Sequence, residues 1–312
     1  MTTPLPRRTA LTIILVLGVL FGGNHIAARI AFDHGTGLAT AVLMRSGLTA
    51  VALLGIVLWQ RVPLRPPAGN GRWLAVLGGL ITLQSLCLYA SVARIPVALA
   101  LLAFNAYPVL YTLVSWALGG KPPTLRASGL MALILFGLVL ALDVPGRLRL
   151  VTDTGAAFWA GVALALAASV LFAFAMWVTD HRVKSVVGAL RSFSTMSLVT
   201  LLLGAACGLA LAGGLGADAQ GAVGTALHWP NDAPGWLGLA GLTLLYGTAF
   251  STLFVLMPRL DMARNAPASN IEPVAAIVMG WLLLGQTLSA LQIVGAAVVV
   301  AGIVGLARSG RG

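Results

Sequence analysis

The segments NAYPVLYTLVSWALGG (residues 105–120) and NIEPVAAIVMGWLLLG (residues 270–285) repeat one pattern 165 positions apart. They share an asparagine, a proline three residues later, a tryptophan and a final glycine. The match continues without a gap to Gly137 and Gly302, and both prolines lie inside apolar runs. Compositional bias alone does not produce such a match. We therefore infer that the chain arose by duplication.

The composition indicates a membrane protein. Apolar residues make up 59% of the 312 residues, charged residues only 9%, and the mean hydropathy is +0.97. Soluble domains of this length do not have such a composition. Ten stretches are long enough to cross the hydrocarbon core, about 30 Å thick, as helices. They are Leu11–Phe32, Leu38–Trp59, Trp73–Ala93, Pro96–Leu118, Leu125–Leu142, Ala156–Val178, Val187–Ala212, Trp236–Met257, Ala266–Leu284 and Leu288–Ala307.

Shorter matches in the same order extend the repeat, such as Trp73-Leu74 with Trp236-Leu237. The halves 1–150 and 151–312 then hold five spans each. Because five is an odd number, the second half enters the membrane in the opposite orientation. The sequence therefore predicts an all-α membrane protein of ten transmembrane helices, built as two inverted five-helix repeats. This is the plan of an alternating-access carrier. We expect the fifth and tenth spans to be peripheral, because they hold almost no polar side chains.

The basic residues predict the orientation. With the N-terminus inside, fourteen of the nineteen lysines and arginines fall in cytoplasmic segments and only Arg94, Arg147 and Arg149 fall outside. The positive-inside rule then places both termini in the cytoplasm and the segment Gly213–Pro234 outside. The basic residues do not cluster on one face, so we expect no nucleic-acid partner.

The N-terminus also has features of a signal peptide, because Arg7 and Arg8 precede an apolar run. Cleavage would remove the span that pairs with the sixth one. We therefore interpret the run as the first helix.

The repeated prolines, Pro108 and Pro273, lie well inside predicted spans, three residues after Asn105 and Asn270. Proline has no N–H and its ring excludes the carbonyl four residues back, so Phe104 in the first repeat loses its backbone partner. Two interpretations stay open. The prolines are structural kinks, with the asparagines donating to the freed carbonyls, or they mark two halves of a substrate site.

Charged residues inside a membrane are costly and usually line a cavity or pair internally. Glu272 is the only acidic residue deep inside a span, at the repeat position of Tyr107. It is either a structural partner or a group that takes and releases a proton during transport. Arg29 and Arg45 either reach to the interface or face inward, where they would favour an anionic group such as a carboxylate. His25 is either a packed hydrogen-bonding residue or one that titrates near neutrality.

Further polar and aromatic side chains at midplane depth come from the third, fourth, sixth and eighth spans. With those of the first and ninth spans they would line one central cavity, although burial between helices explains each of them equally well. Aromatic walls suit an amphipathic or aromatic solute. The predicted substrate-binding residues are Asn24, His25, Gln84, Tyr89, Asn105, Tyr107, Tyr111, Trp177, Tyr246, Asn270 and Glu272.

The chain resembles a known family. The ten-span plan, the segment Asn270-Ile-Glu272-Pro273, the run Trp281-Leu-Leu-Leu-Gly285-Gln286-Thr-Leu-Ser and the glycine-rich last helix are similar to EamA-type members of the drug/metabolite transporter superfamily. That family commonly has glutamate at the position of Gln286, and Lys121 stands at the matching place in the first half. The resemblance implies a basket-like bundle that exports small metabolites, among them amino acids, from the bacterial cytoplasm across the inner membrane. Within this family, the chain is similar to the aromatic amino-acid exporters.

The motifs of other function classes are missing from the sequence. It contains no His-Glu-x-x-His, no paired intramembrane aspartates and no Walker A motif. We therefore expect no enzyme activity, no cofactor and no metal. Transport is either driven by a solute or ion gradient, with proton coupling as one option, or it is passive. Together with the resemblance, these features predict a monomeric secondary active transporter among membrane lipids; export of amino acids, aromatic or other neutral ones, is what the resemblance implies. A lipid scramblase or a non-transporting scaffold is the alternative.

Overall fold

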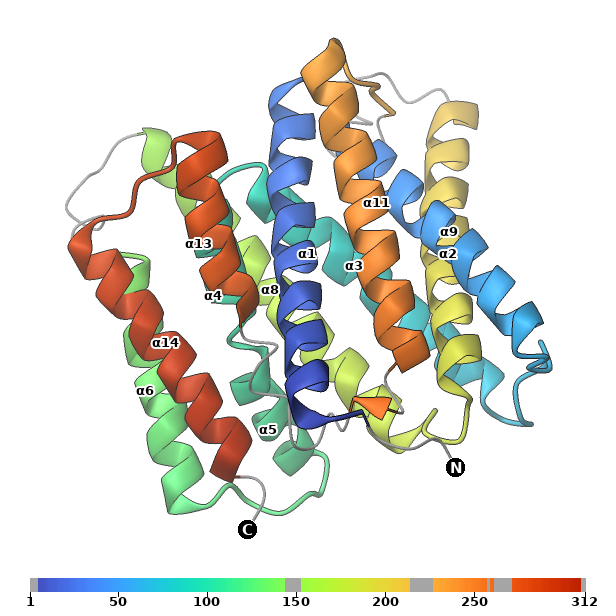
Figure 1. Ribbon diagram of the computed structural model, residues 1–312, viewed down its shortest axis with the longest axis horizontal. Helices are drawn as coiled ribbons and strands as arrows, with labels where there is room; N and C mark the ends of the chain where they lie inside the picture. The colour runs from blue at the N-terminus through green and yellow to red at the C-terminus, as the bar shows by residue number, and fades with distance from the viewer. Residues whose placement is uncertain (1–4, 144–152, 214–226, 257–258, 261–270, 310–312) are drawn as a thin grey trace.

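The computed structural model describes residues 5–143, 153–213, 227–256, 259–260 and 271–309. The regular elements in these ranges are all helices, which confirms the predicted all-α class (Figure 1). They are α1 (Arg7–Asp33), α2 (Leu38–Trp59), α3 (Gly71–Val92), α4 (Val97–Phe104), α5 (Tyr107–Ala117), α6 (Leu125–Ala141), α8 (Asp153–His181), α9 (Gly188–Ala212), α11 (Ala233–Leu256), α13 (Ile271–Leu284) and α14 (Ala290–Ser309).

These helices make ten membrane spans, as predicted. Seven described stretches are long and apolar enough to cross a membrane, and one of them, Val97–Ala117, comprises both α4 and α5. The three shorter apolar helices α6, α13 and α14 complete the ten. The predicted start of the ninth span, Ala266, lies outside the described residues.

Successive spans run in opposite directions, so α1 begins and α14 ends on the same side of the molecule (Figure 1). This side is called the termini side below. The packing of the helices has the symmetry of an inverted repeat. The spans of the first half, α1, α2, α3, α4–α5 and α6, are equivalent in that order to α8, α9, α11, α13 and α14 of the second half. Thus α1 packs on α11 as α8 packs on α3, and α2 packs on α11 as α9 packs on α3. The equivalent pairs α2 with α9 and α6 with α14 also pack on each other.

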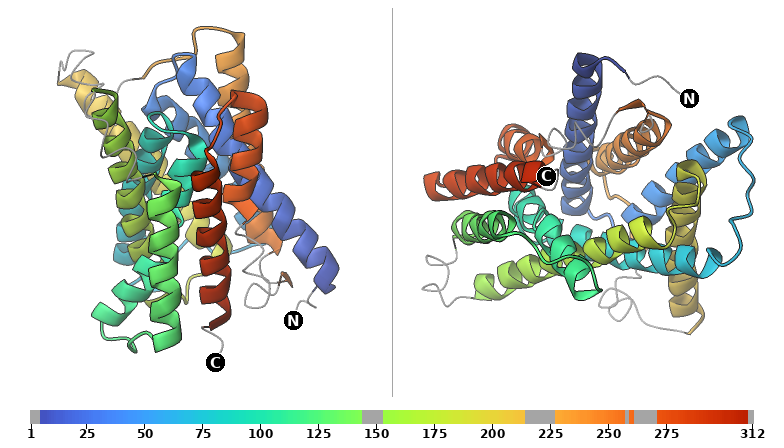
Figure 2. Two further views of the ribbon diagram at one scale, coloured as in Figure 1. Left: turned by 90° about the vertical axis from the view of Figure 1, so that its left-hand side faces the viewer. Right: turned by 90° about the horizontal axis from the view of Figure 1, so that it is seen from below.

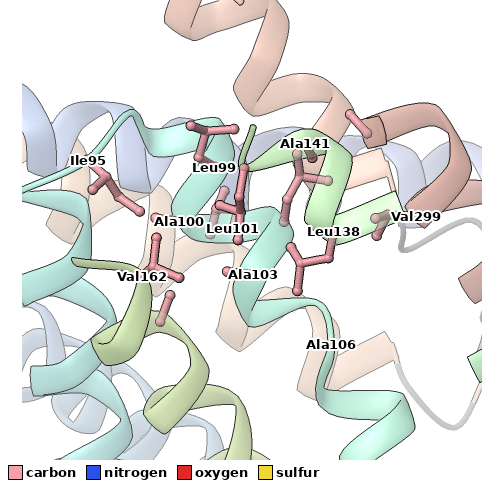
Figure 3. Packing of buried hydrophobic residues seen from close by; sticks show 14 of the residues in the cluster. Ile95, Leu99, Ala100, Leu101, Ala103, Ala106, Leu138, Ala141, Val162 and Val299 are labelled. Carbon is pink, nitrogen blue, oxygen red and sulfur yellow. The ribbon is translucent and has the colours of Figure 1, made fainter. Parts of the chain in front are cut away.

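The most deeply buried element is α4. Its residues Val97 to Ala103 are all buried, in a cluster of side chains from α6, α8 and α14 (Figure 3). The peripheral pair α6 and α14, by contrast, lies at one edge of the bundle when it is viewed from the termini side (Figure 2). There Gly137 of α6 and Gly295 of α14 meet so closely that a Cβ on Gly137 would lie 3.0 Å from the Gly295 carbonyl oxygen.

Glycines also set the distance between α1 and its neighbours at the centre. A Cβ on Gly22 would lie 3.1 Å from the carbonyl oxygen of Glu272, and one on Gly238 of α11 would lie 2.6 Å from the backbone nitrogen of Ala31. Small residues allow such close backbone contact between membrane helices. Not every helical glycine has this role: a Cβ on Gly208 of α9 would have no atom within 4 Å.

The fourth span is broken between α4 and α5, three residues before Pro108. Asn105 caps α4, and its side-chain nitrogen donates to the carbonyl of Leu101 at 2.8 Å, not to the carbonyl of Phe104 as the sequence suggested. Pro108 lies in the first turn of α5, where a missing N–H costs nothing. Pro273 is the third residue of α13, and Asn270 lies outside the described residues.

Candidate functional site

Arg45 of α2 lies at the centre of a buried polar cluster. Its side chain donates from Nη1 to the Tyr89 hydroxyl at 3.3 Å and from Nη2 to Ser85 Oγ at 2.8 Å. The guanidinium carbon lies 4.9 Å from the ring centre of Tyr89 and 4.1 Å from that of Tyr246. These are distances of cation–π contacts. The arginine therefore joins α2 to α3 and α11.

The network continues from α3 to α1. The hydroxyl of Tyr89 donates to Asn24 Oδ1 at 2.7 Å, and both residues are fully buried. These buried hydrogen bonds link α1, α2 and α3 and hold the three helices in a defined register.

The second charged pole of the site is Glu272, near the start of α13. Its Oε1 lies 3.6 Å from Nε2 of His25, whose ring centre is 5.5 Å from that of Tyr89. The hydroxyls of Tyr89, Tyr107 and Tyr246 lie within electrostatic range of this carboxyl group. The side chain of Glu272 is 24% exposed and that of His25 7%, so the carboxylate is the more accessible member of the pair.

Aromatic side chains surround these polar groups. Tyr107 contacts Phe172 edge to face at a centroid distance of 4.9 Å, and Phe104 contacts both rings. On the other side Tyr246 contacts Phe21 and stacks on Phe250 at 5.2 Å. The described residues thus place one cation and one carboxylate among aromatic rings contributed by both halves of the chain.

The structure brings together six of the predicted residues: Asn24, His25, Tyr89, Tyr107, Tyr246 and Glu272. Gln84 is buried next to Ser85 on α3, and Asn105 is buried at the break in the fourth span.

Tyr111 and Trp177 lie apart from this cluster. The hydroxyl of Tyr111 donates to the exposed Asp180 at 2.7 Å, and Trp177 stacks on His181 at 4.9 Å, in the last turns of α8 on the termini side. Arg182 lies over the Trp177 ring and also over that of Trp73. These two predicted residues therefore belong to a second group of aromatic and charged side chains near the ends of α3, α5 and α8.

The predicted substrate-binding residues did not include Arg45, which contacts both Tyr89 and Tyr246 of the cluster. One signal pointed to it. Arg45-Ser46 recurs as Arg191-Ser192 in the second half, so each repeat has an Arg-Ser pair in the first part of its second span.

On the side opposite the termini, the turn after α1 is tied to the segment before α11. His34 Nδ1 lies 2.7 Å from Asp232 Oδ2, and the His34 carbonyl accepts from the backbone N–H of Asn231 at 3.0 Å. The Gly235 N–H donates to the Asp232 carboxylate. This hydrogen bond, together with that of His34, holds the pKa of Asp232 below its usual value.

The two halves of the fourth span differ in burial. Residues 97 to 103 of α4 are buried, whereas Val109 is the one buried residue of α5. The backbone N–H of Val97 at the start of α4 donates to Gln286 Oε1 at 3.2 Å, and Gln286 follows α13. The fourth and ninth spans are therefore joined on the side opposite the termini, and α5 is packed mainly on α8.

Comparison with known proteins agrees with these features. The model of the EamA-like transporter family matches residues 8–142 and again residues 159–308, once over each half. The chain belongs to the EamA-like transporter family. As a family member it is a multi-pass membrane transporter of small solutes.

A solved crystal structure supports the same fold for this EamA-like transporter. It superposes with a TM-score of 0.60 over 98% of this chain and 99% of its own, at 19% sequence identity. This likeness shows the fold alone. A search of the curated proteins found no match.

Proposed function

We propose that this EamA-like transporter exports small metabolites by alternating access, and that its substrates are neutral amino acids, aromatic ones above all. The observation that carries the proposal is the central cluster, where Arg45 and Glu272 stand among aromatic rings without forming an ion pair with each other within the described residues. A neutral amino acid has a carboxylate, an ammonium and a side chain. The cluster offers a complementary group for each.

Three observations support alternating access. The packing has the symmetry of an inverted repeat, so the two ends of the bundle can exchange arrangements. The fourth span is broken at Asn105, at the depth of the site. The two halves of that span differ in burial, as expected of a carrier closed toward one side of the membrane. We assign the first repeat to residues 1–150 and the second to residues 151–312.

We propose that proton movement drives export, with Glu272 as the proton carrier. The Glu272 side chain lies inside a span, is partly exposed and has the histidine ring of His25 3.6 Å away. A proton can therefore reach the carboxylate, and a change in its charge alters its interaction with the histidine. The sequence has no ATP-binding motif, and a monomer with lipids and substrate as its only partners is sufficient for this mechanism.

We propose the bacterial inner membrane as the location, with both termini in the cytoplasm. The fourteen-to-three distribution of basic residues supports this orientation. Single cysteines in a variant without Cys87 and Cys207 test it with an impermeant thiol reagent applied to intact cells. A cysteine in Gly213–Pro234, of which residues 214–226 lie outside the described residues, should react. Reaction at the extreme C-terminus without reaction in this segment would reverse the orientation.

The decisive experiment uses liposomes that contain only the purified protein. Vesicles loaded with unlabelled L-phenylalanine or L-tryptophan should take up the same labelled amino acid by counterflow, and empty vesicles should not. Absence of counterflow for every member of a panel of twenty amino acids would reject the amino-acid assignment. Loss of leaflet asymmetry of a fluorescent phospholipid in the same vesicles would instead support a scramblase.

A further inference from the structure

We propose that Arg45 binds the carboxylate of the transported amino acid, with Glu272 facing its ammonium group, and that this pair of poles makes the carrier selective for zwitterions. The proposal rests on the proposed function and adds to it the substrate group that each charged residue recognises. It assigns to Arg45 a role in specificity that the position of an arginine in a span does not by itself imply.

The first argument is that the charge of Arg45 is not balanced. The residue is 4% exposed, and its hydrogen bonds go to two neutral hydroxyls, those of Tyr89 and Ser85. Within the described residues no carboxylate forms an ion pair with it, and its Nε has no hydrogen-bond partner. A buried guanidinium without a counter-ion is costly. An incoming anion would supply both the missing charge and the missing acceptor.

The second argument concerns the shape of the free edge. Arginine binds a carboxylate most strongly when two N–H groups point at its two oxygens. In Arg45 the unsatisfied Nε and the neighbouring Nη2 form such an edge, and Nη2 is held by the hydroxyl of Ser85 alone. A carboxylate that replaces Ser85 at Nη2 and takes the free Nε would leave the bond from Nη1 to Tyr89 in place.

The third argument is that Tyr246 covers the guanidinium from the other half of the chain. Its ring lies 4.1 Å from the guanidinium carbon and stacks on Phe250, both from α11. Movement of α11 relative to α2 would therefore cover and uncover the cation. The binding of a carboxylate becomes coupled in this way to the relative position of the two repeats.

The opposite charges are also separated. Glu272 contacts His25 and forms no ion pair with Arg45 within the described residues, and Tyr89 contacts both His25 and Arg45. A zwitterion spans such an arrangement with its carboxylate at one pole and its ammonium toward the other. An amine without a carboxylate leaves Arg45 unbalanced, and an acid without an ammonium leaves Glu272 unmatched.

The experiment measures inhibition of counterflow in liposomes by three compounds with the same ring: L-phenylalanine, 2-phenylethylamine and 3-phenylpropionate. In the wild type, phenylalanine should inhibit at concentrations about 10 to 100 times lower than the amine, the range expected for hydrogen bonds to a charged group. Arg45→Gln should reduce this preference to less than about threefold, and Arg45→Lys should give an intermediate value because it keeps the charge without the two-pronged edge. Arg29→Gln is the matched control. Arg29 pairs with Asp33 and should keep the preference for phenylalanine.

The ratio of inhibition constants is measured on folded protein, so a lower yield of a variant does not affect it. If counterflow is intact and the wild type accepts the amine as well as phenylalanine, the zwitterion site is rejected and the export function stands. The same holds if Arg45→Gln keeps the full preference. If the wild type transports none of the twenty amino acids, the proposed function itself fails.

Discussion

His25 of α1 and Glu272 of α13 face each other across the two halves of the chain, with Nε2 of the imidazole 3.6 Å from Oε1 of the carboxylate. The contact exists because Gly22, one turn before His25, lets the backbone of α13 approach α1 closely. Any movement that separates α1 from α13 separates this pair. The charge of Glu272 and the arrangement of the repeats are therefore linked.

This link predicts the effect of Glu272→Gln. The amide keeps the size of the side chain and removes its charge and its proton exchange. We expect proton-driven accumulation of amino acid to fall to the level of empty liposomes. Counterflow exchange, which needs no net proton movement, should continue, although at higher substrate concentrations because the ammonium group loses its carboxylate. Uptake with and without an imposed pH gradient measures the difference.

Asp33→Asn is the control, since Asp33 pairs with Arg29 and does not contact the central cluster. It should keep both activities. Normal accumulation by Glu272→Gln at normal yield would exclude Glu272 as the proton carrier, and loss of folded protein before loss of transport would assign it a structural role.

The second prediction concerns Gln286, which follows α13. Its Oε1 accepts the N–H of Val97 at the start of α4. Gln286→Glu keeps an acceptor and adds a charge that the positive end of α4 favours, so stability should be unchanged or higher by about 0.3–1 kcal/mol. Gln286→Leu removes the acceptor and should cost about 1–3 kcal/mol.

Thermal unfolding in detergent measures both changes, and Thr287→Val, at the exposed next residue, is the control. Equal stability of the glutamate and leucine variants would show that the contact with Val97 contributes nothing.

The sequence predicted the spans well because the length of an apolar run is a local property, and α2 has the predicted bounds Leu38–Trp59. The direction in which a side chain points is not local. Arg45 lies within the second span, as predicted, but its burial depends on tyrosines from α3 and α11. Tyr111 was predicted to lie with the central cluster, but its hydroxyl bonds to Asp180 near the end of α8. The proline alone does not give the position of the break after α4, so the sequence could not place this side chain.

The third prediction tests the close packing of α1 on α11. A Cβ at position 238 would lie 2.6 Å from the backbone nitrogen of Ala31 and 2.9 Å from the carbonyl oxygen of Ala27, so the helices must separate. Gly238→Ala should lower the free energy of unfolding by about 1–3 kcal/mol. Gly208→Ala, where no atom lies within 4 Å of the new Cβ, should be neutral or slightly stabilising. Equal melting temperatures of the two variants would contradict the packing described here.

The fourth prediction is a pH dependence outside the membrane. The Gly235 N–H and the His34 side chain hold the pKa of Asp232 below its ordinary value of 3.8. The folded protein thus binds a proton at Asp232 less readily than the unfolded chain. The ionised carboxylate therefore stabilises the fold fully above pH 3.8, and this contribution is lost as the pH falls through the lowered pKa. Asp232→Asn should therefore melt below the wild type at pH 5 to 8, and the two should converge below pH 3.8. A constant difference across the range would show that the charge of Asp232 is not responsible.

The last prediction joins the break in the fourth span to the transport cycle. Asn105 is buried at that break, and the contact of Gln286 with Val97 closes the bundle on the side opposite the termini. In a variant without native cysteines, cysteines at positions 97 and 286 joined by a short thiol cross-linker should hold that side closed and stop transport. A third cysteine at position 105 should then lose its reactivity toward a reagent applied from that side, whereas one at position 270, the equivalent residue outside the described part of the chain, should still react from the termini side. Asn105→Ala removes the donor to Leu101 and should weaken transport more than assembly. If the cross-link leaves both reactivities unchanged, the fourth and ninth spans do not form a site with alternating access.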